Sequence, residues 1–134
     1  MEVEYSDAYQ GCFVCGKGNS NGMCLEFLWD SEKREAYTRW RPERYMQGFK
    51  NVVHGGFVTM VLDEVMAKVC LFNRTPAVTA RIEVRFKKPV YVNEELEVRG
   101  RWIEARGKRV TLEAWCNDKG KEVRARAQAL FLAV

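Results

Sequence analysis

A long apolar segment in the middle of the chain, residues 55–72, constrains the fold more than any other feature. Read as a helix, it is apolar on almost every side, and only four positions break the pattern: Thr59, Asp63, Glu64 and Lys68. A helix with this pattern is buried and does not lie on a surface. Asn73 and Pro76 end it, so the sequence predicts one long central helix that the rest of the chain must wrap.

The rest of the chain shows the period-2 alternation of apolar and polar residues that is typical of strands. Two strands are expected before the helix, over residues 23–29 and 35–41, and four after it, over residues 78–86, 96–102, 110–116 and 123–131. Turn-forming stretches at 105–108 and 117–121 predict hairpins. We therefore expect an α+β fold in which a curved antiparallel sheet wraps around the helix, and in which the other sheet face or an edge meets a second subunit.

A length of 134 residues fits a single domain over residues 1–134, with an irregular N-terminal segment at 1–22. No apolar stretch reaches the roughly 20 residues of a membrane span, so no membrane partner is expected. The N-terminus lacks the apolar core of a signal peptide and the five cysteines are an odd number, which predicts reduced thiols in a cytoplasmic protein. The net charge of +4 is mild and basic residues alternate with acids, so no nucleic-acid partner is expected.

Three cysteines, Cys12, Cys15 and Cys24, fall close together near the N-terminus, and the first two form a CxxC pair. A structural zinc site needs four ligands, and His54, the only histidine, lies in a motif that points to other chemistry. We therefore expect no metal and interpret this segment as a tight knuckle with half-buried thiols. A zinc-knuckle protein that binds nucleic acid is the alternative that the CxxC pair leaves open.

The two adjacent acids of the helix differ in their surroundings. On a helical wheel, Gly55, Thr59 and Asp63 share one narrow stripe, whereas Glu64 and Lys68 lie on nearly the opposite side. Glu64 precedes Lys68 by four residues, the favourable order for an ion pair. Asp63 has no such neighbour, so it is hydrated, paired in space or used in function. The alternative is a buried aspartate that bonds a backbone amide or a hydroxyl.

The sequence His54-Gly55-Gly56 stands at the start of the helix. Glycines there leave backbone N–H groups uncrowded at the positive end of the helix dipole, an arrangement that can hold an oxyanion. Asp63 lies about 12 Å further along the axis, so one helix cannot present both groups to one carbonyl. Two antiparallel helices packed along the shared stripe could, which predicts a site shared between subunits and present twice per dimer.

Three stretches of the sequence resemble the PaaI-like family of hotdog-fold acyl-CoA thioesterases. They are MQGFKNVVHGGFVTMVLDEVMA (46–67), CFVCGKGNSNGMCLEF (12–27) and RFKKPV (85–90). The order strand, strand, helix, strands is similar to that family's over nearly the whole chain. The resemblance implies a hotdog fold, a homodimer or homotetramer, and hydrolysis of acyl-coenzyme A thioesters. It implies no cofactor, since coenzyme A is part of the substrate.

The resemblance also implies roles for individual residues. Asp63 is the general base or the nucleophile, and the Gly55 N–H supplies the oxyanion hole. His54 lies beside the thioester, and Gln47 in the preceding loop orients the carbonyl or the water. Thr79 matches a Ser/Thr position on the first strand after the helix, but its phase in the sequence places it on the polar face of that strand, so either the strand is bulged there or Thr79 lines an edge cleft.

Substrate binding is expected to involve residues next to this motif and cations at strand ends. The first group is Gly56 and Asn51, and the cations, which would meet the phosphates of coenzyme A, are Lys87, Lys88, Arg106, Lys108 and Arg109. In another branch of the fold the catalytic acid is glutamate, which keeps Glu64 as a rival to Asp63. A non-catalytic hotdog protein that binds an acyl-CoA-like ligand is the alternative function.

Overall fold

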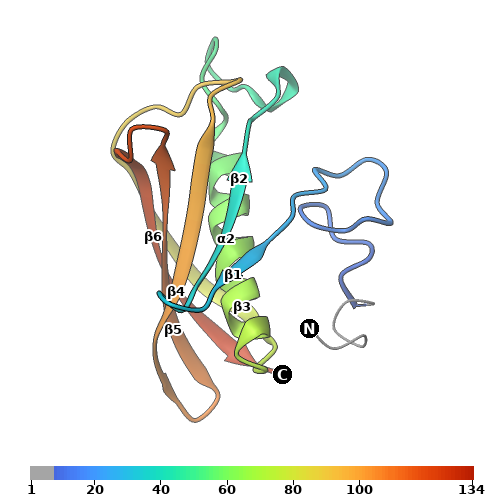
Figure 1. Ribbon diagram of the computed structural model, residues 1–134, viewed down its shortest axis with the longest axis vertical. Helices are drawn as coiled ribbons and strands as arrows, with labels where there is room; N and C mark the ends of the chain where they lie inside the picture. The colour runs from blue at the N-terminus through green and yellow to red at the C-terminus, as the bar shows by residue number, and fades with distance from the viewer. Residues whose placement is uncertain (1–7) are drawn as a thin grey trace.

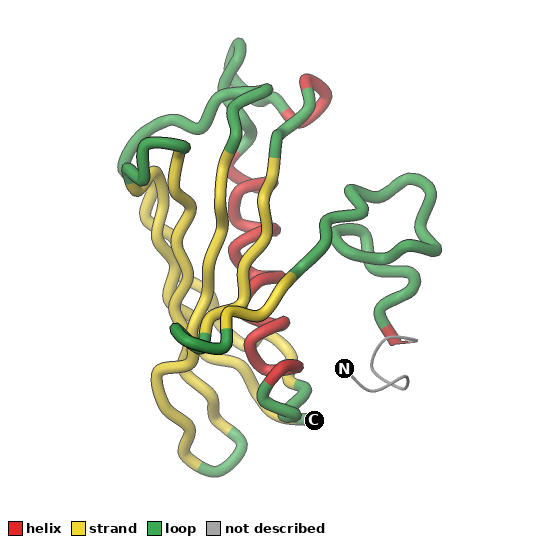
Figure 2. Tube along the Cα trace, viewed as in Figure 1, coloured by secondary structure: helices red, strands yellow, loops and turns green. Residues whose placement is uncertain are grey.

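The structure, a computed structural model of the chain, describes residues 8–134. One six-stranded antiparallel sheet, in the order β1-β2-β4-β5-β6-β3, curves around one long helix, α2 (Figures 1 and 2). The strands are β1 (Leu28–Asp30), β2 (Glu35–Trp40), β3 (Ala77–Phe86), β4 (Leu96–Arg106), β5 (Arg109–Asp118) and β6 (Val123–Ala133), and the helix is α2 (Gly55–Phe72). The predicted α+β architecture, with a sheet wrapped around one central helix, is confirmed.

The first strand is shorter than predicted. β1 begins only at Leu28, whereas a strand was expected from Met23. The missing part bonds elsewhere, because the N–H groups of Met23 and Leu25 donate to the carbonyls of Phe13 and Val14 at 2.7 and 2.8 Å. Residues 23–27 therefore tie the N-terminal segment to the sheet. Residues 1–7 of the irregular segment predicted at 1–22 lie outside the described residues, and residues 9–22 form turns without a strand.

The core lies between α2 and the inner face of the sheet. Val61, Leu62, Val65 and Met66 of α2 are fully buried. The inner face of β6 is built largely from alanines, and Gly100 of β4 lies so close to the helix that an added Cβ would stand 3.1 Å from Val65 Cγ1. Small residues on the sheet thus let the helix approach closely, which explains why its side chains are apolar on nearly every side.

Strand β3 forms an edge of the sheet, and an extra residue interrupts its pairing with β6. Thr79 pairs with Phe131 and Arg81 pairs with Leu130, so Ala80 is a β-bulge. Phe131 is a core residue, and cross-strand partners project to the same face, so Thr79 faces the helix. Ile82, which pairs with Ala129, also faces it. The bulge therefore reverses the phase that strict alternation predicted for Thr79.

The loop before α2 contains one short 3-10 helix, η1 (Arg44–Met46), whose buried Met46 joins the core. Among residues 8–134, no helix has both the length and the apolar character needed to cross a bilayer.

Replacing Leu62 with alanine tests this core. Leu62 is completely buried in α2, so Leu62→Ala is expected to lower the free energy of unfolding by about 2–5 kcal/mol through lost burial and a residual cavity. Urea unfolding at a fixed protein concentration measures the change. Leu132→Ala on β6 is the control, because Leu132 is 39% exposed and its loss is expected to change stability by less than about 1 kcal/mol. Equal effects of the two substitutions would contradict the core described here.

Candidate active site

Asp63 lies on the third turn of α2, half-buried, on the side of the helix that faces β3. The hydroxyl of Thr79 donates a hydrogen bond to Asp63 Oδ1 at 2.5 Å. The bulge at Ala80 brings Thr79 to this position. Among the described residues, no cation forms an ion pair with Asp63, so the Asp63 carboxylate has a hydroxyl as its partner and no compensating charge.

The surroundings of Asp63 favour a weaker acid than an ordinary aspartate. Burial raises the pKa of the Asp63 carboxyl, the hydrogen bond from Thr79 opposes this effect, and the negative charge of Glu64 adds to it. The net pKa is raised. A carboxylate with a raised pKa is a stronger base than a free aspartate, and the arrangement therefore suits proton abstraction or nucleophilic attack.

The start of α2 presents one free N–H group. His54 is the N-cap of the helix, and its Nδ1 accepts a hydrogen bond from the Gly56 N–H at 2.8 Å. Among the hydrogen bonds of residues 8–134, none uses the Gly55 N–H as a donor. Gly55 is the first residue of the helix, so its N–H points outward at the positive end of the dipole. A neutral imidazole that accepts at Nδ1 carries its proton on Nε2, so exposed His54 retains one outward donor.

A groove of ≈ 400 Å³ lies beside Gly55. Its lining is mainly apolar and consists of Val52, Val53, Gly55, Val58, Phe86, Lys87, Lys88, Pro89 and Val90. The Phe86 ring covers Gly55, where an added Cβ would stand 3.3 Å from Phe86 Cζ. Lys87 and Lys88 are exposed, and Lys88 Nζ is 2.7 Å from Glu122 Oε2. Two of the cations predicted to meet phosphates thus border the groove at the predicted oxyanion site.

Gln47 and Asn51 support the loop that leads into the helix. Gln47 Oε1 accepts a hydrogen bond from the Asn51 N–H at 3.0 Å, and Gln47 pairs with Val53 in an isolated bridge. Asn51 has a φ of 63° and its Oδ1 accepts a hydrogen bond from Arg44 at 3.1 Å. Both side chains are exposed near His54, and their bonds hold the approach to the helix in one conformation.

The remaining predicted cations lie elsewhere in the chain. Arg106, Lys108 and Arg109 are in or next to the hairpin between β4 and β5, at the end of the sheet opposite the start of α2 (Figure 1). Because they lie at that end, these three cations are not brought together with Gly55, Lys87 and Lys88 within one chain.

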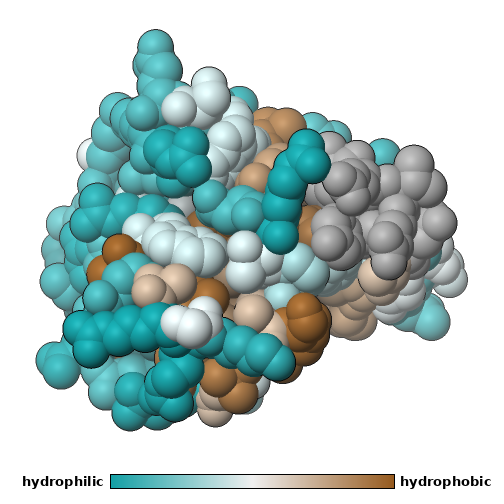
Figure 3. Space-filling model, turned by 90° about the horizontal axis from the view of Figure 1, so that it is seen from below, coloured by the Kyte–Doolittle hydropathy of each residue, from teal (hydrophilic) through white to brown (hydrophobic). Residues whose placement is uncertain are grey.

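Figure 3 shows the molecule from below, with hydrophilic side chains over much of the surface and separate apolar areas between them.

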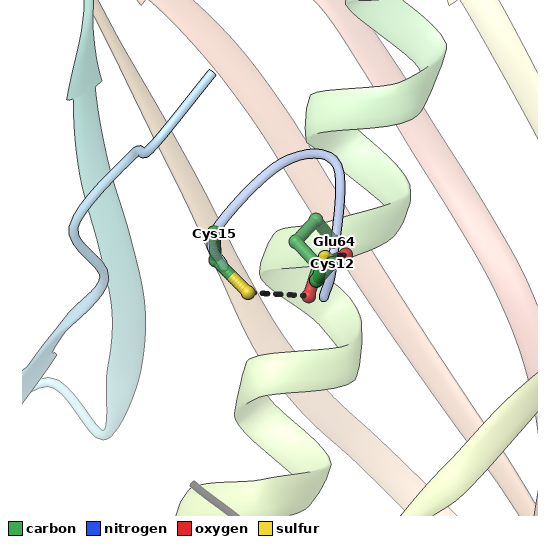
Figure 4. A group of neighbouring side chains, drawn as sticks. All are labelled: Cys12, Cys15 and Glu64. Carbon is green, nitrogen blue, oxygen red and sulfur yellow. Dashed lines mark hydrogen bonds between the residues drawn. The ribbon is translucent and has the colours of Figure 1, made fainter. Parts of the chain in front are cut away.

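Glu64 lies about 100° around α2 from Asp63 and is buried. Its Oε2 is 2.7 Å from Lys68 Nζ, so the predicted ion pair is confirmed. The thiols of Cys12 and Cys15 donate to Glu64 Oε1 and Oε2 at 3.4 and 3.7 Å (Figure 4). Burial, followed by the charge of Glu64, raises the pKa of Cys15 to about 12, so this thiol is protonated at neutral pH. The sequence did not predict that the CxxC pair would meet the helix here.

The chain belongs to the thioesterase superfamily, whose family model matches residues 50–123, more than half of its length. The acyl-coenzyme A thioesterase THEM4 of Rattus norvegicus is 31% identical over 94 residues, which cover 66% of this chain and 38% of that protein. The chain thus spans well under half the length of this relative.

Solved structures show the same fold at lower identity. The PaaI protein of E. coli, from the phenylacetic acid degradation operon, is 13% identical with a TM-score of 0.78, covering 98% of this chain and 91% of that one. A hypothetical thioesterase of Streptococcus pneumoniae TIGR4, solved with coenzyme A, is 12% identical with a TM-score of 0.74, covering 82% and 86%. That protein was also solved with single alanine substitutions of an aspartate and of a threonine 16 residues later. The predicted hotdog fold is confirmed.

The hydrogen bond between Thr79 and Asp63 predicts a measurable pKa. In a ¹³C NMR titration of the carboxyl groups, Asp63 is expected to titrate above the ordinary aspartate value of about 3.9. Thr79→Val removes a bond that stabilises the charged form, so it is expected to raise the pKa of Asp63 further. Thr111→Val on β5 is the control and is expected to leave Asp63 unchanged. A lower pKa in Thr79→Val would contradict the contact.

Proposed function

We propose that this chain hydrolyses the thioester bond of acyl-coenzyme A conjugates at a site shared by two subunits. The observation that carries the proposal is a pair of groups on one side of α2: among residues 8–134, the Asp63 carboxylate has no counter-charge and the Gly55 N–H has no acceptor. Because the chain belongs to the thioesterase superfamily, thioester hydrolysis is the reaction that we assign to these two groups.

The Gly55 N–H and the Asp63 carboxylate have different roles in the proposed hydrolysis. The Gly55 N–H donates to the carbonyl oxygen of the thioester and stabilises the negative charge that develops there. The ionised Asp63 carboxylate either removes a proton from an attacking water or attacks the carbonyl carbon itself, forming an anhydride that water then cleaves. In both routes the thiolate of coenzyme A leaves, and in both the carboxylate must be ionised. The raised pKa of Asp63 strengthens it as a base.

The edge strand β3 supports the shared site. Asp63 contacts Thr79 near one end of β3, whereas Gly55 contacts Phe86 at the other end. If two copies of β3 pair antiparallel near their middle, the end of the strand that carries Thr79 in one copy lies beside the end that carries Phe86 in the other. Asp63 of one subunit and Gly55 of its twin then approach the same groove.

The surface of β3 fits such pairing. It is an edge strand of ten residues, and two of its large apolar side chains, Val78 and Phe86, are 56% and 53% exposed. A long exposed edge of this kind is a template for another strand. The same pairing would bring the β4–β5 hairpin of one subunit, with Arg106 and Lys108, to the end of the dimer where the groove of the other opens. Arg106 and Lys108 of one subunit would then lie at the same end of the dimer as Lys87 and Lys88 of the other.

The comparisons support the ligand and the pair of residues. The Streptococcus pneumoniae protein was solved with coenzyme A, and the aspartate and threonine changed in its variants are 16 residues apart. Asp63 and Thr79 have the same spacing and form a direct hydrogen bond. The apolar lining of the groove suits an acyl chain, and exposed Lys87 and Lys88 suit phosphates.

Replacing Asp63 with asparagine tests the reaction. Asp63→Asn keeps the shape of the side chain but removes the base, so kcat is expected to fall by about 100-fold or more with little change in folding. A free-thiol assay over short, long and aromatic acyl-CoAs measures it, and circular dichroism checks the fold. Glu113→Gln on β5 is the matched control. Activity in Asp63→Asn equal to the parent would remove Asp63 from its role, and a loss in Glu64→Gln alone would transfer the role to Glu64.

The same assay distinguishes the alternative function. A parent protein that melts at a higher temperature with acyl-CoA but releases no thiol from any of these conjugates is a binding protein.

Complementation tests whether two subunits share the site. Gly55→Pro removes the free N–H, and proline is tolerated there because it is the first helical position and His54 has an extended ψ of 130°. We expect a kcat loss of about 100-fold, whereas Gly55→Ala keeps the N–H and controls for crowding against Phe86. Coexpressing Gly55→Pro with Asp63→Asn is expected to restore about one quarter of parent activity, since half the dimers are hybrids with one intact site.

The activity of the hybrid dimers distinguishes a site shared between subunits from a site within one chain. Hybrid dimers isolated with two different affinity tags that are no more active than either single variant would show that Asp63 and Gly55 act within one chain. A parent that is a monomer by light scattering would contradict the shared site directly.

A further inference from the structure

We propose that Cys12, Cys15 and Glu64 form a binding site for a zinc ion on the side of α2 away from Asp63. One ligand atom from each of the three residues lies within 4.8 Å of the others, and no role in the thioesterase proposal uses them. Figure 4 shows both thiols directed at the Glu64 carboxylate. The loop that carries them belongs to the N-terminal segment and packs beside α2. The sequence offered only His54 as a further donor, whereas the fold supplies Glu64.

Each thiol stands at a distance from one Glu64 oxygen that is typical of two ligands of one zinc ion. The Cys12 Sγ to Glu64 Oε1 distance is 3.4 Å and the Cys15 Sγ to Glu64 Oε2 distance is 3.7 Å. In a tetrahedral site with Zn–S of about 2.3 Å and Zn–O of about 2.0 Å, the sulfur and oxygen ligands stand about 3.5 Å apart. The two thiols face different oxygens of Glu64, so the Cys15 side chain must rotate toward Oε1 for both sulfurs and this oxygen to share one ion. Thiolates with a carboxylate favour zinc over magnesium or calcium.

The backbone of the knuckle is built for two converging thiols. The Gly16 N–H donates to the Cys12 carbonyl at 2.9 Å, which closes a tight turn around the CxxC pair. A Cβ at Gly16 would stand 2.3 Å from the Gln10 carbonyl oxygen, so only glycine fits there. Cys12 and Cys15 are half-buried, so an ion can reach them from solvent, and a water would supply the fourth ligand.

Lys68 balances the charge of the site. Its Nζ lies 2.7 Å from Glu64 Oε2 and 3.1 Å from Cys15 Sγ, and over the Tyr9 ring at 3.5 Å. Without metal, the charges of the Glu64 carboxylate and the Lys68 ammonium cancel. When Zn²⁺ displaces the two thiol protons, the ion and Lys68 contribute +3 and the three ligands −3, so the net charge remains zero. Glu64 Oε1 can bind the ion while Oε2 stays with Lys68, which would then orient the ligand from behind.

The test uses the full chain, kept reduced with a phosphine and freed of metal with a chelator. Titration with Co²⁺ as a spectroscopic probe is expected to give a thiolate-to-cobalt charge-transfer band that saturates at one equivalent, and Zn²⁺ is expected to abolish the band and to raise the melting temperature. Cys12→Ser and Cys15→Ser are expected to weaken binding at least about 100-fold, more than the loss of an outer-shell partner.

Cys24→Ser is the matched control, because Cys24 belongs to the same segment, is exposed, and donates to the Gly16 carbonyl instead of to Glu64. It is expected to bind like the parent. Two results would overturn the proposal: no band from a parent whose five thiols all react as free, or equal binding by Cys12→Ser and Cys24→Ser. These readouts do not depend on activity, so they stand whether or not the thioesterase proposal holds.

Discussion

The enclosure of α2 by the sheet is the constraint on which the rest of this structure depends. A helix covered on nearly every side cannot carry an unpartnered polar group without a large desolvation penalty. Each polar side chain inside it accordingly has a specific partner: Thr59 bonds the Gly55 carbonyl at 2.8 Å, Glu64 pairs with Lys68, and Asp63 accepts from Thr79. The same enclosure raises the pKa of Asp63.

Adjacent positions on this helix serve opposite sides of the molecule. Asp63 and Glu64 are separated by one residue step, or about 100° of rotation, which directs one carboxylate to the edge strand β3 and the other to the cysteine knuckle. Within the described part of the chain the Asp63 carboxylate has no counter-charge, so it is suited to react. Glu64 contacts an ammonium and two thiols and is suited to bind a metal ion. The one-residue offset therefore separates the proposed catalytic chemistry from the proposed metal chemistry within a single turn.

Several of these features could be predicted from the sequence because they follow from local rules. The bounds of α2, the ion pair between Glu64 and Lys68, and four strands after the helix follow from apolar periodicity and from spacing along one element. Local rules fail where segments distant in sequence meet. Alternation alone assigned Thr79 to the polar face of β3 and left a bulge or an edge cleft as the two ways for it to reach the site; the structure shows the bulge, in which one extra residue at Ala80 reverses the phase. The short β1 has a similar cause, since its missing residues bond the N-terminal segment.

The sequence by itself determined that one helix had to be buried, that a sheet had to cover it, and that Asp63 lacked a local partner whereas Glu64 had one. These are properties of periodicity and of spacings of three or four residues, which act over a single turn. Only the tertiary structure decided that Thr79 reaches Asp63, that Phe86 covers Gly55, and that Cys12 and Cys15 meet Glu64 across about 50 residues of chain. Such contacts depend on strand register, on a bulge and on how the N-terminal segment folds back, and these are set by packing of the whole chain.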